Sequence, residues 1–226
     1  MKHIKFRNSN KYIAINKIIC VGRNYAEHAK ELGNEIPEKP VIFLKPASAV
    51  IFSGEKIIHP HFSSVMHHEV ELLILIGSRI KNANESESIK SISGFGVGLD
   101  MTLRDIQDEL KKKGHPWTIA KCFDTSAVLS DFISADDYKL TGDEELSLSV
   151  NGFLRQKEKI SMMLFPPVKL VEYISSLMTL EEGDIIFTGT PKGVGQVKTG
   201  DIIEAKLDEL VSLKTEVTSE LFHQSS

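Results

Sequence analysis

Cysteine is scarce in this chain. Only Cys20 and Cys122 occur among its 226 residues, and they form no Cys-x-x-Cys pair. A thiolate metal centre is therefore disfavoured, because such centres need closely spaced cysteines. Two unpaired cysteines in a chain of this length are typical of a reducing compartment, so we expect free thiols and a cytoplasmic location.

Long apolar runs and a large excess of one charge are also missing. No stretch reaches the length of about 20 apolar residues that spans a bilayer, and residues 1–6 lack the apolar core of a signal peptide. The net charge is −4, which provides no electrostatic basis for nucleic-acid binding. We therefore expect neither a membrane nor a nucleic acid as a partner.

Two nucleotide-binding signatures are absent as well. Residues 94–98 lack the glycine spacing of the dinucleotide-binding motif, and residues 189–193 lack the order of a P-loop. The chain is instead 41% hydrophobic, which is enough for a sizeable core. We expect one catalytic domain over residues 1–226, with its core at about 17–217.

Short apolar runs predict more strands than helices. The predicted strands are residues 13–21, 41–44, 70–76, 94–99, 146–150, 153–156, 185–187, 202–207 and 211–217. Asn151-Gly152 between two of them favours a type I′ hairpin turn. Because these strands do not alternate regularly with helices, the pattern indicates the α+β class.

Three helices are predicted from the signals at their ends. Asn24 is a candidate N-cap for a short helix through Leu32, and Thr102 opens a sequence that resembles a capping box. Both of these helices are expected to end at a following glycine. A third helix begins at Pro167 and is expected to run to about residue 178.

Three carboxylates form the most informative group in the sequence. Glu69 and Glu71 stand two apart at the start of an apolar run, and residues two apart on a strand point to the same face. Asp100 closes a second apolar run, and the sequence places no basic residue beside these acids. Acidic groups that face one space repel each other unless protons or a cation neutralise them. A hard divalent metal ion is the simplest solution.

A simpler interpretation places Glu69 and Glu71 on the solvated face of an edge strand. The rest of that strand is Leu-Leu-Ile-Leu-Ile, apolar on both faces, which favours burial. The adjacent His67 and His68 are open to three interpretations: metal ligands, supports of the ligands, or packing residues.

Six motifs occur in one order along the chain. They are CVGRNYAEH (20–28), FLKP (43–46), HHEVE (67–71), LDMTLRD (99–105), WTIAK (117–121) and GTPKGVG (189–195). Together they resemble the fumarylacetoacetate hydrolase superfamily, in its branch of acylpyruvate hydrolases and oxaloacetate decarboxylases. The resemblance implies a mixed β-roll with short flanking helices, a Mg²⁺ or Mn²⁺ ion, and a homodimer.

The resemblance also assigns roles to residues. It makes Glu69, Glu71 and Asp100 the metal ligands, and His28 and Glu31 a catalytic dyad. Read alone, His28 would be a surface histidine, but a carboxylate three residues later on a helix can orient its ring and stabilise its protonated form. Residues 33–40 would then act as a lid over bound substrate.

The remaining assigned residues hold the substrate. The resemblance places Arg104, Gln107, Lys121 and Thr190 in substrate binding, and gives Lys121 a catalytic role too. Without the motif, Lys121 could equally extend its ammonium group to solvent. In an apolar stretch a buried lysine needs a carboxylate or enolate partner.

The expected function is metal-dependent cleavage of β-carbonyl 2-oxo acids to pyruvate. The reactions are hydrolysis of acylpyruvates such as acetylpyruvate and fumarylpyruvate, and decarboxylation of oxaloacetate. In both, the metal stabilises an enolate, and in hydrolysis His28 with Glu31 activates a water.

Two alternatives remain open. One is a 2-hydroxyhepta-2,4-diene-1,7-dioate isomerase or 5-oxopent-3-ene-1,2,5-tricarboxylate decarboxylase of aromatic catabolism. The other, of a different class, is a noncatalytic protein that binds 2-oxo acids through the metal. For the expected homodimer, the apolar stretch Met162–Phe165 is a candidate interface.

Overall fold

The structure is a computed structural model that describes residues 2–7, 9–31, 33 and 35–220. The helices are α1 Ala26–Glu31, α2 Glu85–Ser91, α3 Arg104–Lys112, α4 Thr118–Lys121 and α5 Pro167–Leu177, with the short 3-10 turns η1 Ala47–Ala49 and η2 Ile160–Met162. The strands are β1 His3–Lys5, β2 Tyr12–Ala14, β3 Ile18–Gly22, β4 Val41–Lys45, β5 Val50–Phe52, β6 Lys56–His59, β7 Met66–His68, β8 Val70–Ile76, β9 Ile92–Asp100, β10 Thr102–Leu103, β11 Ala127–Leu129, β12 Ile133–Ser134, β13 Glu145–Val150, β14 Phe153–Lys159, β15 Ile185–Phe187, β16 Gly195–Val197, β17 Ile202–Leu207 and β18 Val211–Ser219.

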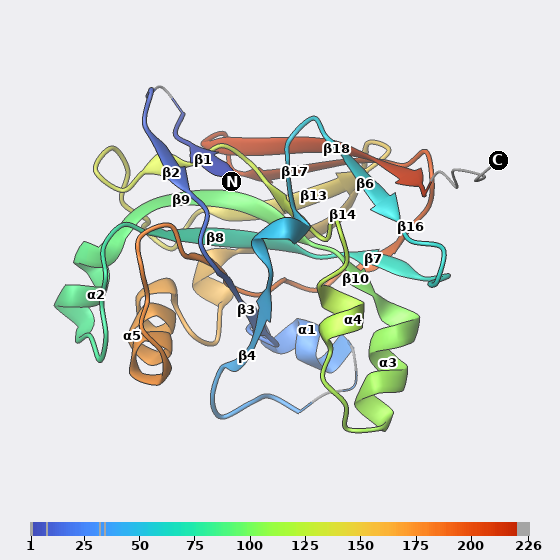
Figure 1. Cartoon of the computed structure of the whole chain (residues 1–226), viewed down its shortest axis with the longest axis horizontal. Coiled ribbons are helices and arrows are strands. Elements are labelled where there is room, and N and C mark those ends of the chain that lie inside the picture. Colours follow the sequence, from blue (N-terminus) through green and yellow to red (C-terminus); the bar gives the residue numbers. More distant parts are fainter. Residues whose placement is uncertain (1, 8, 32, 34, 221–226) are drawn as a thin grey trace.

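Two large sheets dominate the fold. The larger has the order β4-β3-β15-β8-β9-β11-β5, with β12 added beside β9, and the smaller has the order β14-β13-β17-β18-β6. Both mix parallel and antiparallel pairs, because β15 runs parallel to β3 and β18 runs parallel to β6. In Figure 1 strands β6, β17 and β18 of the smaller sheet lie above β8 and β9, whereas α1, α3, α4 and α5 lie below them. The α+β class is confirmed.

Strand β8 is buried on both faces, as its apolar sequence predicts. Leu72 and Ile74 belong to the core that includes the smaller sheet, whereas Leu73 and Leu75 pack in a second cluster with Phe187 of β15. Every residue of β8 is buried. A carboxylate on this strand is therefore removed from water unless it opens into a site.

Glycine on β9 lets the two carboxylate-bearing strands come together. Glu71 of β8 lies opposite Gly98 of β9, and Asp100 follows two residues later. A Cβ atom at Gly98 would lie 2.8 Å from Leu73 Cδ2, so any larger residue would push β9 away from its neighbours. The close pairing brings Asp100 beside the start of β8.

Several predicted elements are confirmed. The hairpin of β13 and β14 turns at Asn151 and Gly152, whose φ angles are 52° and 79°, as a type I′ turn requires. Strands β15 and β17 and the start of helix α5 also lie where the sequence predicts them. These elements are determined by local turn chemistry and by apolar runs.

Two predictions about elements are wrong. The single strand expected over residues 13–21 is divided between β2 and β3, because the chain leaves one sheet and enters another. The capping box at Thr102 does not form. Thr102 belongs to β10, helix α3 begins at Arg104, and the Asp105 carboxylate accepts bonds from Ser63 and Ser64 instead of capping the helix.

The predicted end of α1 falls partly outside the described residues. The described helix runs over Ala26–Glu31, and Leu32 is not among the described residues. Asn34 within the proposed lid is likewise outside them. The side chain of Asn24 does not cap α1 but bonds to the backbone of Thr188 and Phe165.

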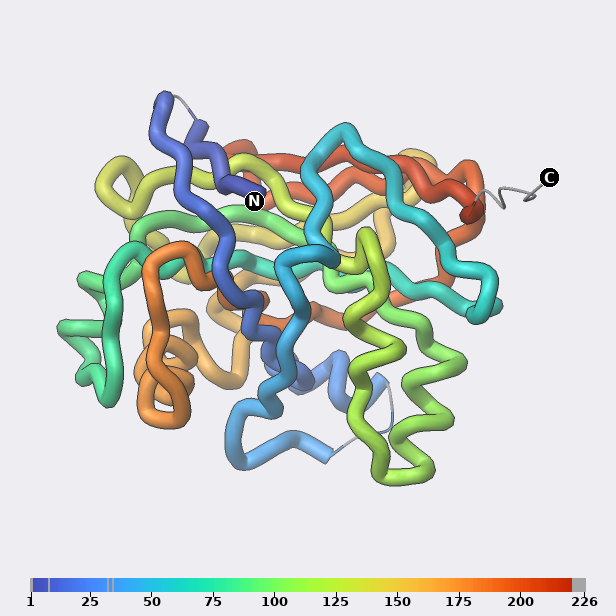
Figure 2. Tube along the Cα trace, viewed as in Figure 1, coloured from blue at the N-terminus to red at the C-terminus, as the bar shows by residue number. Residues whose placement is uncertain are grey.

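Distant parts of the chain meet below the larger sheet. The trace in Figure 2 shows β4 beside α4, and α4 beside α3, although about seventy residues separate the first pair in sequence. Among the described residues, no helix combines the length and apolar character needed to cross a bilayer.

Candidate active site

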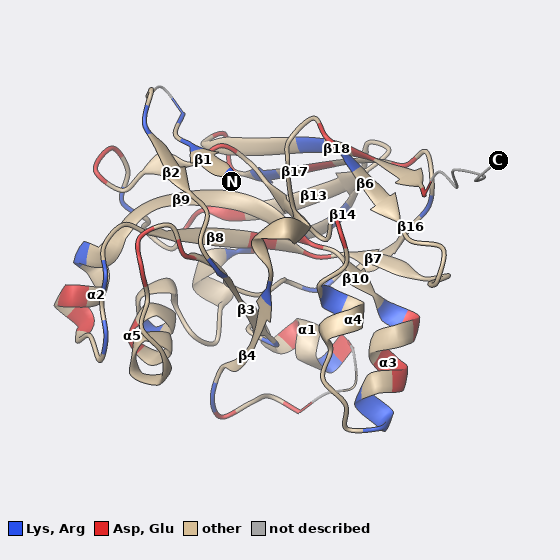
Figure 3. Cartoon of the chain, viewed as in Figure 1, with Lys and Arg blue, Asp and Glu red and all other residues tan. Residues whose placement is uncertain are grey.

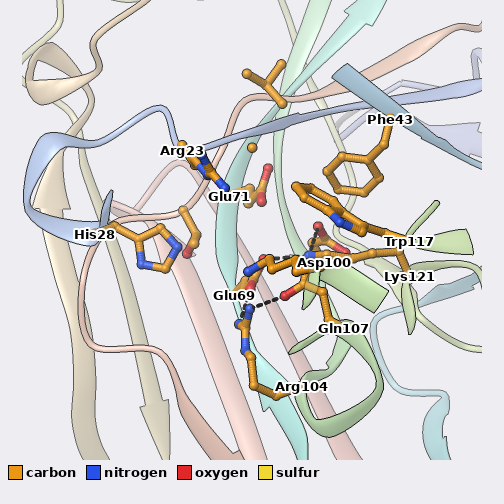
Figure 4. Close-up of a pocket in the computed structure, with 14 residues that line it drawn as sticks. Arg23, His28, Phe43, Glu69, Glu71, Asp100, Arg104, Gln107, Trp117 and Lys121 are labelled. Carbon is orange, nitrogen blue, oxygen red and sulfur yellow. Dashed lines mark hydrogen bonds and ion pairs between the residues drawn. The ribbon is translucent and has the colours of Figure 1, made fainter. Parts of the chain in front are cut away.

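A small pocket lies where these segments converge. Its lining comes from β3, α1, β4, β8, β9, α3, α4 and the turn after β15. The lining residues are Val21, Gly22, Arg23, His28, Phe43, Glu69, Glu71, Asp100, Arg104, Gln107, Lys111, Trp117, Lys121 and Thr190. Figure 4 shows His28 on one side of this pocket and Trp117 with Phe43 on the other. The pocket thus gathers every predicted site residue except Glu31, which contacts His28.

The three predicted carboxylates do meet. Glu69, Glu71 and Asp100 each offer an oxygen, and these oxygens all lie within 4.8 Å of one another. All three residues are at most 5% exposed. One detail of the prediction is wrong, because Glu69 is not on the same strand as Glu71 but in the one-residue break between β7 and β8. Its carbonyl accepts a bond from the Asp100 amide at 2.9 Å, which fixes the break beside the end of β9.

Three buried cations accompany these carboxylates, although the sequence places no basic residue next to them. Lys121 Nζ donates to Glu69 at 2.8 Å and to Asp100 at 2.7 Å. Arg104 donates to the other oxygen of Glu69. The prediction that Lys121 is buried against carboxylates is confirmed, and the alternative in which it extends to solvent is wrong, because it is 3% exposed.

Lys45 is the third of these cations, and the sequence analysis did not identify it. Its Nζ lies 2.8 Å from Asp100 Oδ1 and donates to the carbonyls of Ser126 and Lys121. Lys45 is 1% exposed, at the end of an otherwise apolar strand. The sequence did contain a signal for this residue: a lysine within the apolar motif FLKP needs a charged partner if it is buried.

The electrostatic state of the carboxylates is uneven. Burial, together with the charges of Asp100 and Glu69, raises the pKa of Glu71 well above its ordinary value. Burial acts in the same sense on Glu69, but the charges of Lys121 and Arg104 outweigh it and lower its pKa. Negative charge is therefore least compensated around Glu71.

The donor set fits a hard divalent cation. Carboxylate oxygens are the preferred ligands of Mg²⁺ and Mn²⁺, and these three converge on one point. Asp100 Oδ1 is buried and accepts no hydrogen bond among the described residues, although the Lys45 ammonium is its ion-pair partner. An oxygen of this kind is available to a metal ion.

The two adjacent histidines support the site without joining the metal-ligand group of the described residues. His67 Nδ1 accepts a bond from Arg104 Nε at 3.3 Å, and burial and Arg104 lower the pKa of His67 to about 4. His68 Nδ1 lies 2.9 Å from Gln156 Oε1. Of the three interpretations of these histidines, the geometry favours the support of ligands.

The two residues of the expected dyad contact each other on α1. His28 Nδ1 lies 3.2 Å from Glu31 Oε2, and the Gly193 amide donates to the same carboxylate at 3.0 Å. Burial lowers the pKa of His28, although Glu69 and Glu31 act in the opposite sense. The lowered pKa favours the neutral form of His28, which is able to accept a proton.

Gln156 is a second residue that sequence reasoning missed. Its Oε1 accepts a bond from the Val70 amide at 3.1 Å, and its Nε2 donates to Thr190 Oγ1 at 2.7 Å and to the Pro191 carbonyl at 2.8 Å. Because the Thr190 oxygen accepts from Gln156, its own hydrogen remains available to a substrate. Gln156 thus joins the start of β8 to the turn that carries Thr190.

We expect Gln156→Met to raise KM for a carboxylate substrate and to lower the free energy of unfolding. The methionine leaves the buried Val70 amide and the Thr190 hydroxyl without this partner, at about 1–3 kcal/mol for each orphaned group. Denaturant unfolding and steady-state kinetics would measure both effects. Gln196→Met is the control, because Gln196 is exposed and makes one bond to the Ser64 carbonyl. Equal effects of the two substitutions would contradict this role.

A family model described as "Fumarylacetoacetate (FAA) hydrolase C-terminal" matches residues 17–218. The chain belongs to the fumarylacetoacetate hydrolase family. The predicted resemblance is thereby confirmed, over nearly the range that the motifs indicated.

Relatives of known name place the chain within this family. The oxaloacetate tautomerase FAHD1 of Rattus norvegicus is 46% identical over 200 residues, which cover 88% of this chain and 90% of that protein. The crystal structure of fumarylpyruvate hydrolase from Pseudomonas aeruginosa, in complex with Mn²⁺ and pyruvate, has a TM-score of 0.93 at 33% identity, and covers 97% of this chain and 96% of that one. The 2-hydroxyhepta-2,4-diene-1,7-dioate isomerase of Mycobacterium marinum has a TM-score of 0.81 at 35% identity, covering 92% of this chain and 76% of that one.

These likenesses confirm the fumarylacetoacetate hydrolase type of mixed β-roll and the branch of the family that the motifs indicated. Its members are enzymes, named as tautomerase, hydrolase and isomerase. A Mn²⁺ ion in the fumarylpyruvate hydrolase, together with the buried acidic cluster of this chain, supports a divalent metal as its cofactor.

Proposed function

We propose that this protein is a metal-dependent enzyme that interconverts the enol and keto forms of oxaloacetate. The observation that carries the proposal is the convergence of Glu69, Glu71 and Asp100 beside the ammonium of Lys121. The high identity with an oxaloacetate tautomerase over most of both chains supports this substrate. Tautomerisation was not among the reactions predicted from the sequence, but it shares their enolate.

Glu69, Glu71 and Asp100 would hold a Mg²⁺ or Mn²⁺ ion. Such an ion supplies a Lewis acid that stabilises the negative charge of an enolate. Lys121 stays protonated in this setting: burial opposes its charge, but Asp100 and Glu69 outweigh burial and raise its pKa. It adds positive potential where charge develops on the substrate.

The other side chains would position the substrate and move its proton. Thr190 and Gln107 face the same pocket and would donate hydrogen bonds to the substrate carboxylate. His28, oriented by Glu31, would carry the proton that leaves or joins C3. Arg104 holds Gln107 at 2.6 Å and so fixes the orientation of its amide.

Hydrolysis of acylpyruvates is the second candidate, and the His28–Glu31 pair favours it. His28 would take a proton from water, and the hydroxide would add to the distal carbonyl. The bond between that carbon and C3 then breaks, which releases a carboxylic acid and the enolate of pyruvate. A proton on C3 completes the reaction. Decarboxylation of oxaloacetate needs no nucleophile and yields the same enolate.

The test is a set of assays on chelator-stripped protein, with and without added Mg²⁺ or Mn²⁺. Decay of enol-oxaloacetate absorbance measures tautomerisation, and pyruvate release from oxaloacetate and acetylpyruvate measures the two cleavages. Metal-dependent loss of the enol that outpaces pyruvate release is the expected result. Metal-dependent pyruvate release without accelerated tautomerisation would favour the cleavage reactions.

The alternatives from aromatic catabolism and from binding proteins are tested by the same samples. The likeness to the M. marinum isomerase supports adding a dienoic diacid as a substrate. If the protein isomerises that diacid and converts none of the other compounds, it is the isomerase and our proposal is wrong. Metal-dependent binding of 2-oxo acids, without turnover of any of these compounds, would identify a noncatalytic protein.

The acid limb of the hydrolysis pH profile should depend on Glu31. Burial lowers the pKa of His28 below its ordinary 6.5, so the acid limb should have its midpoint below that pH. The Glu31 charge raises the pKa of His28, so Glu31→Gln should move the midpoint further toward acid pH. The pH dependence of kcat/KM measures both midpoints. An acid limb that does not move in Glu31→Gln would contradict the pairing.

The homodimer and the cytoplasmic location remain proposals. Within the candidate interface, Met162 is 56% exposed whereas Met163 is buried, so one of the two methionines is available to a second copy. Light scattering of the purified protein would determine its oligomeric state.

A further inference from the structure

We propose that Arg23 and Lys111 form a subsite for the distal carboxylate of the substrate and make the enzyme selective for dicarboxylic 2-oxo acids. The inference rests on the proposed function for the end of the substrate that carries the 2-oxo group. The proposed subsite adds recognition of the opposite end of the substrate, which carries the distal carboxylate.

The charges of the pocket are the first argument. Lys45, Lys121 and Arg104 form ion pairs with Asp100 and Glu69, so that three cations accompany the three carboxylates of the site. Arg23 and Lys111 line the same pocket but have neither a hydrogen bond nor an ion pair with any acidic group in the described part of the chain. A divalent metal ion would add further positive charge. A substrate with two negative charges therefore complements this pocket better than one with a single charge.

The surroundings of Lys111 are the second argument. Lys111 lies in the last turn of α3, and Figure 3 shows that the basic residues of this helix lie at its two ends. The Lys111 ammonium lies 5.6 Å from the centre of the Trp117 ring. Burial and the charge of Arg104 lower the pKa of Lys111, Arg23 adds to this effect, and Asp108 opposes it. Lys111 and Arg23 thus line one pocket and carry charges of the same sign. An anion between them would relieve the repulsion between these charges.

The backbone at Arg23 is the third argument. Arg23 has a φ angle of 59°, in the left-handed region that residues other than glycine rarely adopt. The next residue, Asn24, is fully buried and bonds through its side chain to the backbone of Thr188 and Phe165. This anchor holds the strained turn between β3 and α1. Strain of this kind is typical of functional positions, and here it places Arg23 at the pocket, on the same side as His28 (Figure 4).

The wall across from Arg23 suits the middle of such a substrate. Phe43 and Trp117 pack edge to face, with ring centres 5.8 Å apart, and both line the pocket. Carbon atoms between two carboxylates would lie against these rings. The pocket thus offers a polar end at the three acids, an apolar side, and a second cationic end.

Binding of two inert 2-oxo acids tests the subsite directly. 2-Oxoglutarate and 2-oxopentanoate have the same five-carbon chain and differ in a distal carboxylate against a methyl group. Calorimetry with Mn²⁺-loaded protein should show about tenfold tighter binding of 2-oxoglutarate, the size of one charge-assisted contact. Arg23→Gln and Lys111→Gln should each reduce this ratio, and the double variant should bring it near one. The variants should still bind 2-oxopentanoate, which shows that they fold, and should lose less affinity for it than for 2-oxoglutarate.

Two further variants sharpen the test. Lys112→Gln removes the same charge from the adjacent, exposed position of α3 and should preserve the ratio. Arg23→Lys should preserve most of it. A ratio near one in the unaltered protein, or an unchanged ratio in the double variant, would overturn the subsite. If the ratio behaves as expected but oxaloacetate is not converted, the subsite stands and the proposed function fails. If oxaloacetate is converted while the double variant keeps its selectivity, the proposed function stands and the subsite fails.

Discussion

Glu71→Gln is expected to abolish tight binding of Mg²⁺ and Mn²⁺ and to raise the thermal stability of the metal-free protein. Glutamine keeps an oxygen that can accept the hydrogen bond from the Gly189 amide, which Glu71 accepts at 2.6 Å. It removes the negative charge that metal binding needs. Metal affinity should fall at least about a hundredfold, since even residues behind metal ligands contribute about 10–100-fold.

The gain in stability has a separate cause. In the metal-free protein the Glu71 carboxylate is buried beside Asp100 and Glu69, and burial together with these charges raises its pKa. An uncharged side chain of the same size relieves both the repulsion and the desolvation. The melting temperature of the chelated variant should therefore exceed that of the chelated unaltered protein, and added metal should no longer raise it.

Calorimetry and thermal unfolding, each with and without chelator, measure the two effects. Glu109→Gln is the matched control, because Glu109 is exposed on α3 and pairs only with Lys113 among the described residues. It should leave metal affinity unchanged. Unaltered Mg²⁺ affinity in Glu71→Gln would show that the three carboxylates are not the metal site.

His28→Ala is expected to reduce acetylpyruvate hydrolysis and oxaloacetate tautomerisation by about 10²–10⁴-fold, the range typical of a lost general base. Metal affinity should stay within a few-fold, because His28 is not in the ligand group. Metal-dependent decarboxylation of oxaloacetate should be affected least, since it needs no activated water. This separation distinguishes His28→Ala from Glu71→Gln, which should abolish all three reactions.

The control for this prediction is His115→Ala, an exposed histidine just beyond α3. It should leave all three rates unchanged. Steady-state rates at saturating metal, with metal affinity measured on the same samples, decide the outcome. Near-normal hydrolysis in His28→Ala would remove the dyad from the mechanism and transfer the role of base to another group.

Local patterns predicted much of the fold. The Asn151-Gly152 turn and the apolar run of β8 each carry their information within a few neighbouring residues. Predictions were wrong where the chain changes partners. Residues 13–21 pass from one sheet to another. Thr102 pairs with β7, and its hydroxyl oxygen accepts a hydrogen bond from the Lys121 ammonium instead of capping a helix. No local pattern records a partner that lies distant in sequence.

The sequence by itself determined the family, the α+β class and the three acidic groups, because motif order, strand periodicity and acidic spacing are properties of the chain alone. Only the tertiary structure decided which cations meet them. Lys45 reaches Asp100 from a strand 55 residues earlier in the sequence. Arg23, from the turn after β3, and Lys111, from α3, line one pocket although they are far apart in the sequence. Charges act through space and depend on burial, so their pairing is set by how the sheets and helices pack.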